Sequence, residues 1–184
     1  GFLHALHATG CACERSGWTP RYVTLWRENA LVGAMPLYLK SHSYGEYVFD
    51  WAWAEAYHRH GLAYYPKALG AVPFSPVTGP RLLARDSATR ALLADRALQL
   101  ARETSSLHVL FPTEDEAREL EAAGMLVRRS VQFHWENRGY ASFGEFLSDL
   151  APVKRKKIRQ ERRRVQDAGV RLRRLVGAQI TGED

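Results

Sequence analysis

Residues 21–40, RYVTLWRENALVGAMPLYLK, decide the fold of this 184-residue chain. Up to Arg27 polar and apolar residues alternate, which predicts a strand with one buried face. Glu28 and Asn29 then form a turn, and an apolar run follows from Ala30 to Lys40. The segment therefore predicts a β-hairpin. Pro36 marks an edge or a bulge in it, because proline has no amide hydrogen to donate to a sheet.

The rest of the chain predicts alternating helices and strands. The clearest helices begin at Ser87, where an apolar stripe follows, and after Thr113, which caps an acidic first turn. Residues 10–20 and 64–80 predict loops. Helices are expected over residues 2–8, 51–60, 87–103, 114–123, 142–150 and 152–169, and strands over residues 81–84, 107–111, 126–129, 131–137 and 170–176.

Residues 41–57, SHSYGEYVFDWAWAEAY, mix large aromatic side chains with ionisable ones. This mixture is typical of a pocket wall, where apolar groups give shape and a few polar atoms fix orientation. It is also typical of an aromatic-rich core strand that runs into a helix. The first interpretation predicts that Glu46 and Asp50 are partly accessible and face one cavity, the principal pocket, with Trp51 or Tyr44.

Glu46 and Asp50 stand four positions apart, close to His42. If the backbone is helical there, the two carboxylates share a face, and their proximity raises the pKa of one of them into the range of a general base. Alternatively, Asp50 only caps the next helix and Glu46 pairs with a surface cation. The candidate catalytic residues are Glu46, Asp50 and His42.

Other polar residues lie in segments that predict loops or an exposed strand. Lys67 has the charge to bind a phosphate or carboxylate group, although a lone lysine is commonly a solvated surface residue. The turn at residues 78–81 offers backbone donors and a cation to an anion, or is purely structural. Residues 131–137 carry polar groups on both faces, which fits a groove or an exposed edge. The candidate substrate-binding residues are Ser43, Tyr44, Trp51, Trp53, Tyr65, Lys67, Thr78, Arg81, His134 and Asn137.

The net charge of +6 comes from one segment. Residues 154–164 hold eight Lys or Arg and one Glu, and the remainder holds 18 basic and 19 acidic residues. A concentrated patch of this kind attracts anions and can bind RNA phosphates through counterion release. The alternative is a solvated connector helix whose cations meet acidic residues elsewhere. The candidate nucleic-acid- or anion-binding residues are Lys154, Arg155, Lys156, Lys157 and Arg159.

The composition is that of a soluble globular protein. No apolar run is long enough to cross a bilayer, and no basic-then-apolar leader is present, so we expect a cytoplasmic protein without a membrane span. Cys11 and Cys13 are the only cysteines. Their spacing is poor for a disulfide, and no His or Cys partners complete a zinc site, so we predict reduced thiols and no metal.

Several sequence blocks, in this order, resemble one bacterial family. The family consists of predicted N-acyltransferases labelled peptidoglycan biosynthesis/recognition proteins, which are relatives of the Fem-type peptidyl transferases. The matching blocks are GAMPLYLK (33–40) with the aromatic stretch 41–57, YYPK (64–67), VPFSPVTGPR (72–81), QFHWEN (132–137) and KRK (154–156).

The resemblance implies an α/β fold with a GNAT-like lobe, in which helices flank a central mixed sheet. It assigns residues 1–150 to this lobe, 151–169 to a basic connector helix and 170–184 to the start of a second, truncated lobe. The lobe boundary is expected between Asn137 and Pro152. We therefore expect a piece of a longer protein, with the missing C-terminal lobe as a partner of this one.

The resemblance also implies transfer of an acyl or aminoacyl group to the amine of a small molecule or peptide. Acyl-CoA and aminoacyl-tRNA are the donors to consider, and tRNA would suit the basic segment. GNAT enzymes hold acyl-CoA in an Arg/Gln-x-x-Gly-x-Gly/Ala loop at a helix start, and this pattern is absent. We therefore expect no cofactor bound by these residues and no turnover by them alone. The competing class is an RNA-binding module without catalysis.

Overall fold

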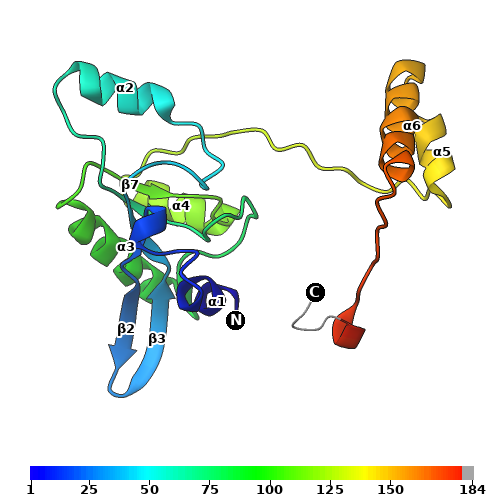
Figure 1. Cartoon of the computed structure of the whole chain (residues 1–184). Coiled ribbons are helices and arrows are strands. Elements are labelled where there is room, and N and C mark those ends of the chain that lie inside the picture. The colour runs from blue at the N-terminus through cyan, green and yellow to red at the C-terminus, as the bar shows by residue number, and fades with distance from the viewer. Residues whose placement is uncertain (180–184) are drawn as a thin grey trace. The chain divides into compact units, whose positions relative to one another are not determined.

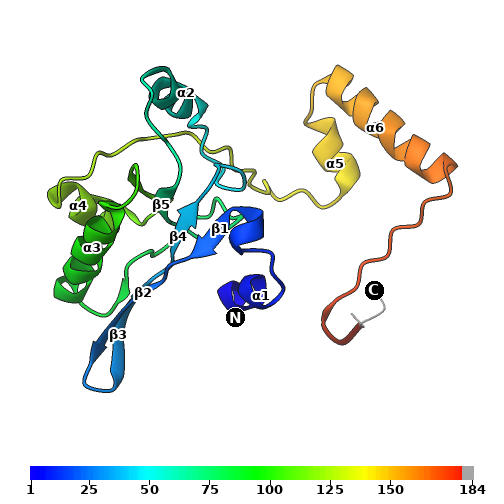
Figure 2. The ribbon, with the colours of Figure 1, turned by 60° about the vertical axis from the view of Figure 1, so that its left-hand side comes forward.

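The computed structural model of the protein describes residues 1–179, which belong to two compact units that divide after Arg129. The first unit is built on a four-stranded sheet of order β1-β4-β5-β7, of which Figure 1 labels β7 and Figure 2 labels β1, β4 and β5. The first three of these strands pair antiparallel, and β7 runs parallel to β5. The prediction of a mixed sheet flanked by helices is confirmed. The strands are β1 (Trp18–Pro20), β4 (Leu37–Lys40), β5 (Lys67–Gly70) and β7 (Leu107–Val109).

The predicted hairpin belongs to a second sheet of order β2-β3-β6. Strands β2 (Val23–Arg27) and β3 (Ala30–Met35) pair antiparallel and project from the body of the unit (Figure 2), and β3 also pairs with β6 (Leu83–Ala84). The apolar run expected to form one strand is divided at Pro36 into β3 and β4, which lie in different sheets. Proline cannot continue the donor ladder, so the chain changes sheets there.

The four-stranded sheet has a hydrophobic core on each face, because side chains alternate along its strands. On β4, Leu37 joins one core and Tyr38 the other; on β5, Ala68 and Leu69 divide in the same way. The first core is covered by the predicted apolar stripe of α3, with Leu93 fully buried. The helices of this unit are α1 (Phe2–Ala8), η1 (Glu14–Ser16), α2 (Trp51–Arg59), α3 (Ser87–Ala101) and α4 (Glu114–Ala122).

Glu116 connects the start of α4 to the segment before β6. Its carboxylate accepts hydrogen bonds from the main-chain N–H groups of Thr113 at 3.2 Å, Leu82 at 2.7 Å and Arg81 at 2.9 Å. The hydroxyl of Thr113 in turn accepts from the Glu116 N–H, which completes a capping box. The predicted cap is therefore present, and the same carboxylate also joins two distant segments.

The second unit contains α5 (Phe143–Ser148), α6 (Pro152–Asp167) and η2 (Gly177–Gln179). Ser142 caps α5 by accepting from the Glu145 N–H at 3.1 Å, and Pro152 occupies the first turn of α6, as the sequence predicts. The guanidinium of Arg162 lies 4.5 Å from the ring centre of Phe143, which brings the two helices together.

Three predicted strands are wrong: none of the described residues 126–129, 131–137 and 170–176 belongs to a strand. Phe133, for example, is 98% exposed. Their alternation satisfies the local pattern of a strand, but no neighbouring strand pairs with it. The two compact units divide after Arg129, whereas the sequence predicts a lobe boundary between Asn137 and Pro152.

Two segments predicted as loops contain regular structure, since residues 10–20 hold η1 and β1 and residues 64–80 hold β5. The end of the expected second lobe, residues 180–184, lies outside the described residues. Among the residues that the structure describes, no helix combines the length and apolar character needed to cross a membrane.

Candidate functional site

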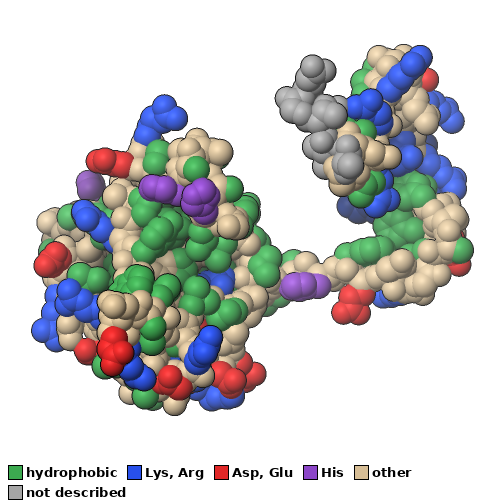
Figure 3. Space-filling model, turned by 90° about the horizontal axis from the view of Figure 1, so that it is seen from below, with side chains coloured by type: hydrophobic (Ala, Val, Ile, Leu, Met, Phe, Trp, Pro, Cys, Tyr) green, Lys and Arg blue, Asp and Glu red, His purple; other side chains and the backbone are tan. Residues whose placement is uncertain are grey.

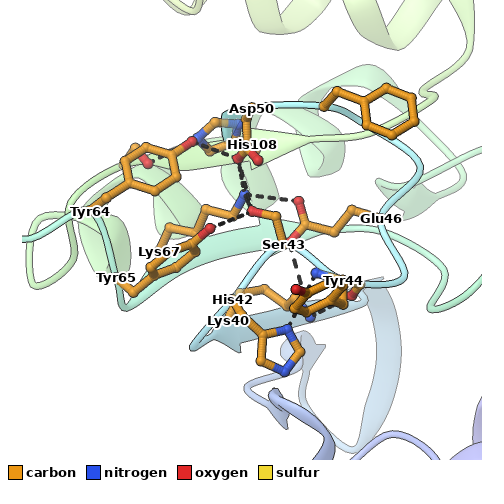
Figure 4. Close-up of polar contacts among 12 residues, drawn as sticks. Lys40, His42, Ser43, Tyr44, Glu46, Asp50, Tyr64, Tyr65, Lys67 and His108 are labelled. Atoms are coloured by element: carbon orange, nitrogen blue, oxygen red, sulfur yellow. Dashed lines mark hydrogen bonds and ion pairs between the residues drawn. The ribbon is translucent and has the colours of Figure 1, made fainter. Parts of the chain in front are cut away.

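Two lysines face each other where β4 and β5 pair. Lys40 and Lys67 are in register on the adjacent strands, and both side chains are fully buried. Two neighbouring buried cations are costly unless anions compensate them. The loop that follows β4 supplies the anions, because it returns over the lysines and buries Glu46 and Asp50, each 2% exposed (Figure 4).

Lys67 is the centre of this arrangement. Its Nζ donates to Oδ2 of Asp50 at 2.5 Å, to Oε2 of Glu46 at 2.8 Å and to Oγ of Ser43 at 2.8 Å. Oδ2 of Asp50 also accepts from the hydroxyls of Tyr64 at 2.7 Å and Ser43 at 3.0 Å. We call this set, completed by the Tyr65 hydroxyl at 2.8 Å from Ser43 and by Lys40, the Lys67 cluster.

Lys40 occupies a less polar position. Its Nζ lies 3.7 Å from the centre of the Trp18 ring, donates to the carbonyl of Tyr44 at 3.3 Å and is 4.0 Å from Oε1 of Glu46. Burial lowers the pKa of Lys40 to about 8, against the opposing attraction of Glu46 and with some help from Lys67. Glu46 thus bridges both lysines.

The two carboxylates have pKa values shifted in opposite directions. Burial raises the pKa of Glu46, and Lys67 only partly opposes the shift. Burial alone would also raise the pKa of Asp50, but hydrogen bonds from Lys67, Tyr64 and Ser43 outweigh it and lower that pKa. The sequence predicts that proximity of the two carboxylates raises the pKa of one of them, but burial is the main cause of the raised pKa of Glu46.

The prediction that Glu46 and Asp50 are accessible is wrong, because Lys67 draws both carboxylates inward. The alternative, in which Asp50 caps the next helix and Glu46 pairs with a surface cation, is also wrong in its details. Asp50 occupies the N-cap position of α2, but its side chain makes no capping hydrogen bond. The cation that pairs with Glu46 is buried rather than on the surface.

His42 is half-buried and lies apart from the two carboxylates. Its Nδ1 accepts from the main-chain N–H of Tyr44 at 3.3 Å, and its ring packs against Gly17. Burial, followed by the nearby Lys40, lowers the pKa of His42. Because the Nδ1 lone pair is used in this hydrogen bond, the ring is poorly placed to accept a proton from a substrate.

The same loop and the first turn of α2 expose large aromatic side chains to solvent. The ring of Tyr44 meets those of Trp51 and His42 edge-to-face, with centroid distances of 5.5 Å and 5.2 Å. We call the outward set the aromatic face. Its members, between 49% and 77% exposed, are Tyr44, Tyr47, Phe49, Trp51 and Trp53.

The groove of about 580 Å³ in the first unit lies elsewhere. It is lined by residues 31–34 of β3, residues around β6 and the first turn of α4, and by none of residues 41–57. The aromatic stretch therefore does not line this groove, contrary to the expectation that it forms the principal pocket. The large aromatic side chains of this stretch are instead exposed, whereas its two carboxylates are buried.

The loop backbone is held in an uncommon conformation. Gly45 and Tyr47 have φ values of 79° and 59°, and the latter is unusual for a residue with a side chain. Any Cβ at position 45 would lie 2.6 Å from the Phe74 ring, and the Phe74 N–H donates to the carbonyl of Gly45 at 3.2 Å. Such strain persists only where the surroundings enforce it. The loop part of the aromatic face, which leads into Trp51 and Trp53 of α2, is therefore preorganised.

Two predicted site residues of the first unit, Thr78 and Arg81, belong to a turn that does not contribute to the Lys67 cluster. Arg81 is buried, and its guanidinium donates to main-chain carbonyls, including those of Leu110 at 2.9 Å and Val77 at 2.7 Å. This favours the purely structural interpretation of the turn, in which Thr78 is exposed.

His134 and Asn137 belong to the second unit and are exposed. The side-chain oxygen of Asn137 accepts from the N–H groups of Gly139 and Tyr140. The basic residues 154–157 and Arg159 all lie on α6. The structure thus gathers Ser43, Glu46, Asp50, Tyr65 and Lys67 in one cluster, and the aromatic residues beside it.

Three members of the site were not predicted from sequence: Lys40, Tyr64 and His108. His108 lies on β7, its ring packs edge-to-face on Tyr64, and its Nε2 is 2.9 Å from the Ser106 hydroxyl. Burial and then the charge of Lys67 lower the pKa of His108 to about 4. Among the described residues, no group of three or more His, Cys, Asp or Glu side chains is placed to hold a metal ion.

The depressed pKa of His108 predicts a pH dependence of stability. Below about pH 6.5 the unfolded chain gains a proton that the folded state does not bind, so stability is lost as the pH falls toward 4. We expect a loss of about 1–2 kcal/mol between about pH 7.5 and pH 5, measured by urea unfolding. His108→Gln should remove most of this loss. The exposed His58→Gln is the control, and an unchanged slope in His108→Gln would exclude this origin.

The comparisons with known proteins give one match. A family model described as FemAB-like, peptidoglycan biosynthesis/recognition, matches residues 1–184. No curated protein and no solved structure matches the chain. The matched range includes the Lys67 cluster, the aromatic face and α6.

Proposed function

Because the chain belongs to the FemAB-like family of peptidoglycan biosynthesis or recognition, we propose that it recognises a peptide or glycopeptide acceptor and serves acyl transfer to an amine of that acceptor. The family supports the role in peptidoglycan. The reaction class, the cytoplasmic location of the protein and a GNAT-like identity of the first unit are parts of the proposal. The proposed GNAT-like identity is supported by a hairpin followed by alternating helices and strands around a mixed sheet.

The observation that carries the proposal is the aromatic face, which lies on the preorganised loop and the first turn of α2. Exposed Tyr and Trp rings provide broad apolar contacts together with hydroxyl or indole N–H donors, a combination that suits sugar rings and peptides. The buried Lys67 cluster fixes the loop before any ligand arrives. The ordering cost of binding is thereby reduced, which increases affinity.

In this proposal Glu46 and Asp50 are positioning residues. Both are buried and held by Lys67, so they hold the loop that carries the aromatic face and do not touch the acceptor. Correct placement of an amine beside an activated acyl group can itself supply much of the rate. Acyl-CoA and aminoacyl-tRNA remain the proposed acyl donors.

The test is binding of a disaccharide–peptide fragment of peptidoglycan, measured by isothermal titration calorimetry. Trp51→Ala should weaken binding about tenfold or more, as expected for an aromatic anchor. Trp26→Ala is the matched control, because Trp26 is also exposed, at 61%, but lies on the β2–β3 hairpin. Equal losses in the two variants, or no binding by the unaltered chain, would refute recognition by the aromatic face.

Acyl transfer is tested separately by mass spectrometry of the acceptor after incubation with acyl-CoA or aminoacyl-tRNA. Residues 1–184 are expected to bind the acceptor without acylating it, since they lack the loop pattern that holds acyl-CoA. Acylation by these residues alone would contradict this expectation. A longer chain of the same protein that binds the acceptor but acylates it with neither donor would contradict the reaction class.

A further inference from the structure

The second unit carries a concentrated set of cations on α6. Lys156, Arg159 and Arg163 follow one another at spacings of three and four residues, so they share one face of the helix. All three are exposed. Glu161 is the single acidic residue among residues 154–164 and lies 3.9 Å from Nζ of Lys157. The helix therefore presents a strongly positive surface.

The same unit also exposes large apolar side chains. Val131, Phe133 and Trp135 alternate along an extended segment, and each is at least two-thirds exposed. Phe143 at the start of α5 and Val153 at the start of α6 are exposed as well. Figure 3 shows hydrophobic side chains next to Lys and Arg side chains on this unit. The second unit thus combines a positively charged helix with solvent-exposed apolar side chains.

We propose that the second unit binds the surface of an anionic lipid bilayer. The Lys and Arg side chains of α6 would meet lipid phosphates, and the exposed aromatic and aliphatic groups would enter the boundary between headgroups and acyl chains. Surface-bound segments combine these two features. An RNA would satisfy the cations and some aromatic rings, but it would leave Val131 and Val153 in water. The inference is independent of the acceptor-binding proposal, because it concerns other residues.

The experiment is co-sedimentation of the whole chain with vesicles. One preparation contains phosphatidylcholine alone, and the other contains phosphatidylcholine and phosphatidylglycerol in equal amounts. We expect binding to the anionic vesicles that weakens with salt. Combined replacement of Lys156, Arg159, Arg163 and Arg164 with Gln should weaken binding about a hundredfold. The control variant also loses four exposed cations, but in the first unit. It replaces Arg15, Arg21, Arg27 and Arg102 with Gln.

A second variant separates lipid from RNA. Val131→Ser combined with Phe133→Ser keeps every charge and alters two exposed side chains, so folding is unaffected. It should weaken vesicle binding about tenfold or more and leave binding to an RNA hairpin unchanged. Equal binding to both vesicle types, equal loss in the first-unit control, or salt-dependent RNA binding without vesicle binding would overturn the proposal.

Discussion

Replacing Lys67 with Met should lower the free energy of unfolding of the first unit by about 3–5 kcal/mol. The substitution leaves Glu46 and Asp50 buried without the cation that they share. Lys40 cannot replace it, because its Nζ is 4.0 Å from Glu46 and turned toward the Trp18 ring. Urea unfolding at neutral pH, followed by circular dichroism, measures the loss.

Removal of the stranded charges should reverse part of this effect. Lys67→Met combined with Glu46→Gln and Asp50→Asn should be more stable than Lys67→Met alone, because neutral amides cost less to bury than carboxylates. The exposed Lys156→Met serves as the control and should change stability by less than about 0.5 kcal/mol. A similarly small change in Lys67→Met would show that the cluster does not hold the loop.

Glu116→Ala should destabilise the first unit by about 2–4 kcal/mol in the same measurement. The Glu116 carboxylate is buried and accepts from the main-chain N–H groups of Arg81, Leu82 and Thr113. Alanine leaves these donors without an acceptor and also removes half of a capping box.

Two variants make this second prediction specific. Glu116→Gln keeps one acceptor oxygen and should lose less stability than Glu116→Ala. The exposed Glu121→Ala, on the same helix, should be nearly neutral. If the variants at positions 116 and 121 were equally stable, the link between α4 and the segment before β6 would contribute little.

Local signals predicted the helices well. Thr113 and Ser142 cap the helices that follow them, and Pro152 begins α6, because each of these effects depends on neighbours within one turn. Strands were predicted less reliably, since they require partners. Residues 131–137 alternate as a strand should but have no pairing strand, whereas Lys67–Gly70 pairs on both sides without a distinctive pattern.

In the site, too, features that depend on neighbouring residues could be predicted, and features that depend on distant residues could not. The spacing of Glu46 and Asp50 indicated that the two carboxylates lie together, and they do, but on a loop and around a lysine. The register that sets Lys40 opposite Lys67 depends on strand pairing across many residues. The sequence therefore predicts ionisable residues among aromatic ones, but it predicts that Glu46 and Asp50 are accessible, whereas the fold buries them.

The charged side chains of this loop are buried, whereas the aromatic side chains of the loop and of the start of α2 are exposed, and this difference has an evolutionary consequence. Substitutions at Tyr44, Trp51 or Trp53 change the outer surface without disturbing the contacts of Lys67. If the aromatic face binds the acceptor as proposed, acceptor preference can change through substitutions at these exposed positions with little effect on stability. Substitutions in the buried ion cluster should destabilise the loop, so we expect related chains to vary more at the aromatic face than at the ion cluster.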